Sequence, residues 1–309
     1  MLEQAVRAAA APLHVPGQAG TPAQPRVWWV ISPAQVEAIA AEHSLPRWQV
    51  EVAALEAEIV PLPYMRNLAR FAIRGQLELL RSAVTVVGSG LPVKKCLQIL
   101  AAHGIGRLRV LVPSQSPAVG RQSSVKPDQG HSNCVDPIAP TTRDPRLASP
   151  HALAAVVTNQ NASLETSAET IDLRRGDPVS LLGEPGFPPD GWVVAACVED
   201  MAEEMLLQVA CKRRGVPLVL AGLQEDLGQA TTILPGDLGV PLIYQADHPH
   251  LDRSRPGSLR GDGYQGMIVG AWLADQVIAL RLGLGEVLQN RLLYADMQSG
   301  EMQTFSLGR

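Results

Sequence analysis

The chain is poor in aromatic residues, in paired cysteines and in long hydrophobic runs, and each shortage limits what it can be. Aromatic residues make up 4% of the 309 residues, so the core must be mainly aliphatic. The four cysteines lie far apart and form no CxxC pair, which favours buried or free thiols in a reducing cytoplasm. No apolar run reaches the roughly 18–20 residues that a membrane span needs, so we expect a cytoplasmic protein without a membrane partner.

Positive charge is also scarce. The formal net charge of −4 gives no general reason to expect nucleic acid or an acidic membrane surface as a partner. Residues 1–26 contain four prolines and lack a basic region followed by an apolar core. We therefore predict a flexible leader and no signal peptide.

A small helical appendage is predicted after this leader, within residues 1–60. Residues 26–31, RVWWVI, suit a short strand, and Ser32-Pro33 supplies an N-cap and a first-turn proline for a helix. A second helix follows, and it carries three glutamates: Glu51, Glu56 and Glu58. Because phosphates would repel these charges, the helix-turn-helix outline does not favour DNA binding.

The stretch 84–112, VTVVGSGLPVKKCLQILAAHGIGRLRVLV, has the pattern of a strand, a glycine turn, a helix and a second strand. Gly104 is placed to end the helix. This pattern is the opening βαβ unit of a nucleotide-binding sheet. Residues 113–150 follow with seven prolines and almost no apolar periodicity, so we predict a long mobile loop within the domain.

Strands and helices then alternate to the end of the chain. Apolar runs such as GWVVAACV (191–198) and VPLVLAG (216–222) are typical of strands buried on both faces. Helices are expected near 200–214 and 267–283. The alternation predicts an α/β fold, a doubly wound, mainly parallel Rossmann-like sheet over residues 61–309.

Three motifs in this domain occur in an order that is typical of one family. They are Tyr64-x-Arg66-Asn67 followed by Gly75-Gln76, then Gly228-Gln229-x-Thr231, then the closing RLLYADMQSGEMQTFSL. On these motifs the chain resembles the ThiF/MoeB/HesA family, bacterial relatives of ubiquitin-activating enzymes. The resemblance implies ATP and Mg²⁺ as cofactors, adenylation of the C-terminal glycine of a ubiquitin-like sulfur carrier protein, and a homodimer.

The glycine turn departs from the family pattern GxGGxG, because residues 88–93 read GSGLPV. Exposed backbone N–H groups in such a turn bind phosphates at a helix N-terminus. Gly88, Ser89 and Gly90 allow the tight turn and are candidate cofactor-binding positions. The next three residues put Leu and Val where the family has glycine, and Pro92 removes an N–H donor.

Acidic residues are missing where the resemblance expects them. Val112 and Ser114 stand in place of two aspartates at the end of the second strand, which also weakens an NAD-dependent dehydrogenase as an alternative. The family's zinc-binding CxxC pairs are absent, so we expect no zinc. Asp247-His248-x-His250-x-Asp252 has ligand-type residues, but Pro249 lies among them and a polar loop is the simpler interpretation.

The resemblance leaves a short set of charged candidates. Arg66 matches an arginine that reaches ATP phosphates, sometimes from the partner subunit, and its alternative is a surface salt bridge. Lys94, in the first helical turn, could gather an anion, and its alternative is a solvated surface pair with Lys95. The candidate catalytic residues are Arg66, Arg121, Glu199 and Asp200, and the cofactor-binding lysines are Lys94 and Lys126.

Two functional hypotheses follow from these departures. In the favoured one, the protein is a catalytically impaired or inactive family member that acts as a binding and dimerisation scaffold in sulfur-carrier or cofactor biosynthesis. The alternative is an active, divergent adenylyltransferase, which would stabilise the transferring phosphoryl charge with metal and cationic residues. Measured binding of ATP-Mg²⁺ would separate the two.

Overall fold

An eight-stranded sheet forms the centre of the computed structural model, which describes residues 1–15, 26–114, 149–175, 177–182, 191–198, 200–224, 226–239 and 263–307. The strand order is β11-β10-β9-β8-β7-β4-β5-β6. The strands are β4 (Ala83–Gly88), β5 (Arg107–Pro113), β6 (Glu165–Ile171), β7 (Trp192–Cys197), β8 (Leu218–Gln224), β9 (Leu227–Ile233), β10 (Arg291–Asp296) and β11 (Glu301–Ser306).

Parallel pairing joins β6, β5, β4, β7 and β8, and antiparallel pairing joins β8 to β9, β10 and β11. All six residues of β4 and of β7 are buried, as their continuous apolar runs predicted. The doubly wound, mainly parallel α/β fold is therefore confirmed, with β9–β11 as an antiparallel extension.

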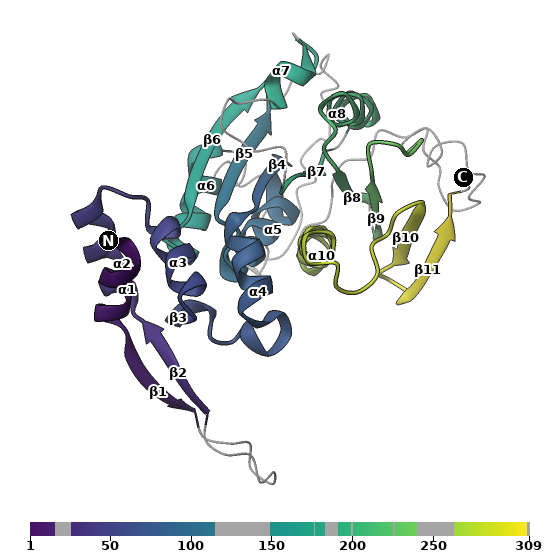
Figure 1. Cartoon of the computed structure of the whole chain (residues 1–309). Coiled ribbons are helices and arrows are strands. Elements are labelled where there is room, and N and C mark those ends of the chain that lie inside the picture. Colours follow the sequence, from purple (N-terminus) through teal and green to yellow (C-terminus); the bar gives the residue numbers. More distant parts are fainter. Residues whose placement is uncertain are drawn as a thin grey trace, which may run out of the picture.

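Helices cover both faces of the sheet (Figure 1). One core contains Val84 and Val86 of β4 together with buried residues of α4, α5, α6 and α10. Val87 lies in the opposite core, against α7 and α8, because side chains alternate along a strand. The helices are α4 (Leu68–Arg81), α5 (Gly90–His103), α6 (Pro150–Gln160), α7 (Pro178–Leu182), α8 (Met201–Arg214) and α10 (Tyr264–Leu282).

The N-terminal unit, residues 1–15 and 26–61, is a small α/β layer of its own. Its helices α1 (Leu2–Ala9), α2 (Pro33–His43) and α3 (Arg47–Glu56) enclose a separate core that includes Val6, Ile31 and Val50. Its sheet has the order β1-β2-β3, from strands β1 (Ala11–Val15), β2 (Arg26–Ile31) and β3 (Ile59–Pro61).

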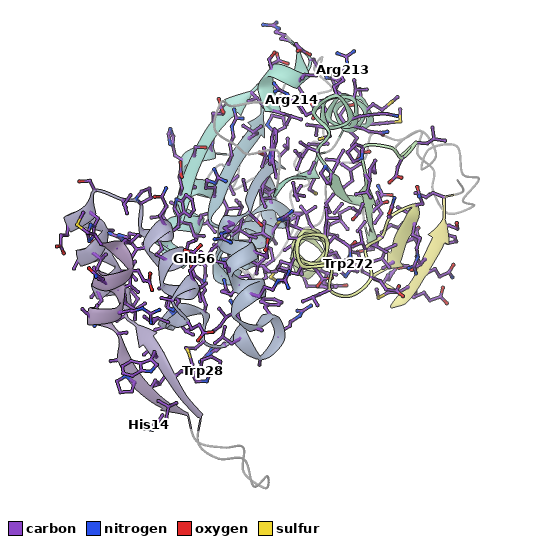
Figure 2. All side chains as sticks on the ribbon, in the orientation of Figure 1. His14, Trp28, Glu56, Arg213, Arg214 and Trp272 are labelled. Carbon is purple, nitrogen blue, oxygen red and sulfur yellow. The ribbon has the colours of Figure 1, made fainter. Side chains whose placement is uncertain are left out.

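The predicted capping of α2 is present, because the Ser32 side chain and the Gln35 side chain form a reciprocal capping box. The prediction of a flexible leader was wrong for residues 2–15. These residues form α1 and β1, because Val6 is fully buried and the Gln35 amide donates to the Ala9 carbonyl at 2.6 Å. The β1–β2 hairpin extends away from the main sheet, and Figure 2 shows His14 and Trp28 on it.

No helix of the described residues is long and apolar enough to span a membrane. The predicted loop of residues 113–150 lies almost entirely outside the described residues. The first residue of that stretch, Pro113, instead completes β5, and its last residue, Pro150, begins α6.

Candidate functional site

The glycine turn lies where β4 ends and α5 begins, at the carboxyl edge of the parallel strands. Gly88 has φ +132°, and a β-carbon there would stand 2.1 Å from the Cys197 carbonyl oxygen. Gly90 has φ +81° and open space beside it, so its backbone conformation alone favours glycine. Ser89 is the N-cap of α5, and its side chain makes no capping hydrogen bond. The tight turn predicted from the sequence is therefore formed.

The first turn of α5 is packed into the protein. Val93, which replaces a family glycine, is fully buried, and its Cγ2 atom lies 3.0 Å from the position of a β-carbon on Gly88. The Pro92 carbonyl lies against Gly270 of α10, 2.3 Å from where a β-carbon would be. Leu91 and Lys94 are half-buried. The replacements thus serve packing between α5, β4 and α10, where the family pattern would leave room for phosphate.

Asp200 lies at the next strand end and caps α8. Its Oδ1 atom accepts a hydrogen bond from the Ala202 N–H at 2.7 Å, and its Oδ2 atom is paired with the Arg174 guanidinium. Arg174 also approaches Glu203, at 4.0 Å. Both carboxylate oxygens of Asp200 are therefore in use. The pairing of Arg174 with Asp200 could not be predicted from the sequence, because Arg174 reaches α8 from the turn that follows β6.

The end of β5 offers no acidic side chain. Val112 is buried in the core with α5 and α6. The Ser114 N–H donates to the Ile171 carbonyl at 2.6 Å, which continues the pairing of β5 with β6. Val112 and Ser114 therefore take part in core packing and strand pairing.

Arg66 lies at the opposite edge of the sheet from the glycine turn. Its neighbour Tyr64, the last residue of the short helix η1 (Leu62–Tyr64), packs on Gly104 at the end of α5. Asn67 contacts Gln76, which donates to the His103 carbonyl. Since α5 has 14 residues, about 20 Å separate its two ends. Arg66 is exposed, and within one chain the structure does not bring it to the turn.

The family-type motifs around Arg66 therefore have structural roles. Asn67 and Gln76 tie the start of α4 to the end of α5 through the hydrogen bonds above, and Tyr64 packs on Gly104. Thr231 likewise donates to the Arg291 carbonyl at 2.8 Å and joins β9 to β10. These motifs predicted the fold correctly. The contacts of their side chains are structural, because they join two helices and two strands of the fold.

Four predicted features lie outside the described residues: Arg121, Lys126, Glu199 and the segment 247–252. Among the residues that the structure does describe, no group of three or more His, Cys, Asp or Glu side chains is arranged to hold a metal ion. Asp200 is thus the one candidate for Mg²⁺ among the described residues, and its carboxylate is already paired with Arg174.

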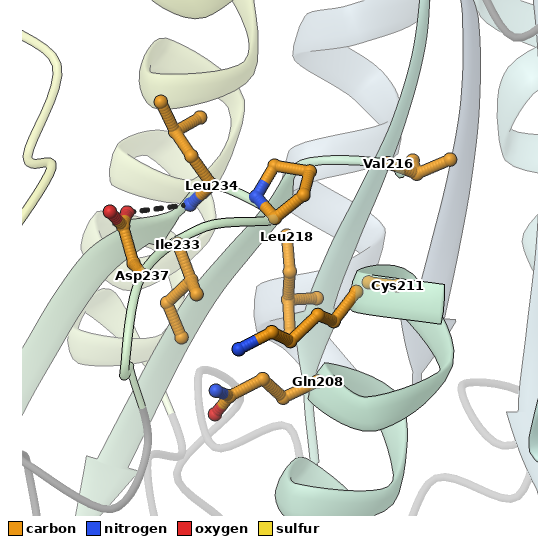
Figure 3. A pocket seen from close by; sticks show the side chains of 9 residues that line it. Gln208, Cys211, Val216, Leu218, Ile233, Leu234 and Asp237 are labelled. Atoms are coloured by element: carbon orange, nitrogen blue, oxygen red, sulfur yellow. Dashed lines mark hydrogen bonds between the residues drawn. The ribbon is translucent and has the colours of Figure 1, made fainter. Parts of the chain in front are cut away.

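A shallow depression lies between α8 and the end of β9 (Figure 3). Its polar groups already serve the turn after β9. Asp237 accepts from the Leu234 N–H at 2.8 Å, and the Gln208 amide donates to the Leu238 carbonyl at 2.6 Å. Because it lies where β8 begins, it opens at the amino edge of the parallel strands, away from the glycine turn.

Comparison with known proteins agrees with this architecture. No family model matches the chain. The SAMP-activating enzyme E1 of Haloferax volcanii is 28% identical over 236 residues, which are 74% of this chain and 78% of the relative. The adenylyltransferase and sulfurtransferase MOCS3 of Drosophila grimshawi is 29% identical over 247 residues, 78% of this chain, and the match spans 50% of that longer protein.

Solved structures share the fold. E. coli MccB with succinimide superposes with a TM-score of 0.58 at 16% identity, over 89% of this chain and 83% of MccB. PaaA superposes with a TM-score of 0.55 at 16% identity, over 80% of this chain and 73% of PaaA. The molecule is thus a doubly wound α/β protein of the MccB type. Its sequence relatives, at 28% and 29% identity, support the resemblance to the ThiF/MoeB family.

Proposed function

We propose that this protein is a catalytically impaired member of its family, which acts as a binding and dimerisation scaffold in sulfur-carrier or cofactor biosynthesis. The observation that carries the proposal is the engaged carboxylate of Asp200. One of its oxygens caps α8 and the other pairs with Arg174. A bound Mg²⁺ needs free carboxylate or phosphate oxygens around it.

The electrostatics of this pair oppose a divalent cation. An ion pair between partly exposed side chains contributes only about 0–1 kcal/mol, so the pair could be broken at small cost. However, Arg174 would remain beside the site with its positive charge, which repels Mg²⁺. The packed first turn of α5, where Pro92 has no N–H, weakens phosphate binding in the same place.

The partner we propose is a ubiquitin-like sulfur carrier protein or another component of the same biosynthetic system. Support comes from the relatives, one named a SAMP-activating enzyme and the other an adenylyltransferase and sulfurtransferase. A homodimer is part of the proposal. Arg66 lies near the far end of α5, a helix about 20 Å long, so in this arrangement it could meet the glycine turn only in a second subunit.

Calorimetric titration of the full chain with ATP-Mg²⁺, followed by pyrophosphate exchange with a candidate carrier, tests the proposal. We expect no binding at micromolar ATP and no exchange, with the same result for Asp200→Asn. Micromolar binding that Asp200→Asn abolishes, together with exchange, would instead establish the active adenylyltransferase. Circular dichroism of both proteins controls for folding.

A further inference from the structure

A buried carboxyl group joins the N-terminal unit to the main sheet. Glu51 of α3 has 0% of its surface exposed. The Tyr64 hydroxyl donates to its Oε2 atom at 2.9 Å. The Asn161 amide, in the turn before β6, donates to the Tyr64 oxygen at 2.9 Å and to the Ala101 carbonyl at 3.2 Å. Of the three glutamates near this helix, Glu51 is therefore buried in the protein.

The second carboxyl oxygen of Glu51 is less well satisfied. Oε1 is buried and accepts no hydrogen bond from the described residues. Burial raises the pKa of Glu51 to about 7, although the Ser163 hydroxyl, Tyr64 and Arg47 each lower it to a smaller extent. The neutral acid therefore suits this position better than the carboxylate does, since a buried charge without a full set of partners is costly.

Few other charges face this carboxyl group. Arg47, one helical turn away, is already paired with Glu37 of α2 at 2.5 Å. The other ionisable groups on the elements around α3 include Glu3 and Arg7 of α1, Glu42 and His43 of α2, Tyr64 of η1, Arg70, Arg74, Glu78 and Arg81 of α4, Arg107 of β5 and Glu165 of β6. Arg81 pairs with Glu56, and Arg107 lies over the Trp48 ring, 5.5 Å from its centroid.

A groove of about 650 Å³ runs beside the same contact. Residues 37–48 of the N-terminal unit form one wall, and residues 162–165 of the main domain form the other. Ser163, which influences the Glu51 carboxyl, is part of that second wall. The N-terminal unit and the main domain are thus separated along this line, and contacts such as that of Glu51 hold them together behind it.

We propose that protonation of Glu51 controls how tightly the N-terminal unit docks on the main sheet. With Glu51 neutral, α3 stays docked through Tyr64 and Asn161. With Glu51 ionised, the buried charge favours a state in which α3 separates and the groove widens. This device does not depend on nucleotide binding or on the proposed scaffold function.

The direction of the pH effect follows from proton linkage. Docked Glu51 binds its proton more tightly than an exposed glutamate, whose ordinary pKa is 4.5. Docking is therefore strongest below pH 4.5, weakens as the pH rises through the interval up to about 7, and then stays constant.

Hydrogen–deuterium exchange of the full chain, corrected for intrinsic rates, tests the device. Between about pH 5 and about pH 8, we expect protection of α3 amides to fall on the order of 100-fold relative to α10. Glu51→Gln keeps an acceptor for Tyr64 and should abolish this dependence. The matched control Glu56→Gln, on the same helix but at the surface, should preserve it. Constant protection in the wild type would overturn the proposal, and so would a pH dependence that persists in Glu51→Gln.

Discussion

The carbonyl oxygen of Cys197 lies against the α-carbon of Gly88, because these two residues are paired across β7 and β4. A β-carbon on Gly88 would stand 2.1 Å from that oxygen, and the φ of +132° also disfavours any other residue. Glycine is thus required here by the sheet itself. Its presence in the turn is not by itself a sign of nucleotide binding.

Gly88→Ala should lower the free energy of unfolding by about 3 kcal/mol or more, since it adds a backbone clash to an unfavourable φ. Urea denaturation followed by circular dichroism measures the change. The matched control is Gly236→Ala, where a β-carbon meets nothing within 4 Å. The control should stay within about 0.5 kcal/mol of the wild type. A stable Gly88→Ala variant would contradict the close packing of β4 on β7.

Gly270→Ala should also destabilise the protein, which reverses the usual effect of this substitution in a helix. Alanine normally gains roughly 0.5–1 kcal/mol over glycine in a helix interior. At this position the added β-carbon would stand 2.3 Å from the Pro92 carbonyl oxygen, so α10 would have to move away from α5. Thermal unfolding should show a lower Tm. A raised Tm would mean that the two helices are less closely packed.

Glu169→Ala should cost about 1–3 kcal/mol of stability, because it removes the carboxylate partner of a buried guanidinium. The Arg109 side chain is 6% exposed, and its Nε atom donates to Glu169 at 3.0 Å. The exposed pair of Glu286 and Arg291, at 2.7 Å, provides the comparison. Glu286→Ala should change the urea midpoint little, and equal effects of the two variants would contradict this reasoning.

The described cysteines should resist thiol reagents in the folded protein. Cys96, Cys197 and Cys211 are buried thiols, as the sequence predicted. Burial raises the pKa of Cys211 to about 12 and that of Cys96 further, so the reactive thiolate is scarce at mildly alkaline pH. In a Cys134→Ser background, Ellman's reagent should detect three thiols only after unfolding in urea. Rapid reaction without urea would contradict the burial.

The strands and the helix ends were predictable because their causes are local. Continuous apolar runs predicted β7 and β8, and the glycine at 104 does end α5 with φ +77°. Ser32 caps α2 as expected. The helix α1 and the strand β1 of residues 2–15 could not be predicted in this way, since α1 is stabilised by a core made from distant segments of the N-terminal unit.

The sequence by itself determined the alternation of strands and helices, the tight turn at Gly88, and the absence of acidic residues at the end of β5. Only the tertiary structure decided the roles of Asp200 and Glu51. Arg174 reaches Asp200 from 26 residues before it, and Asn161 reaches Glu51 through Tyr64 from 110 residues further along the chain. Such partners are set by how the elements pack, because a carboxyl group responds to burial and to nearby charges in space and not to its neighbours in the chain.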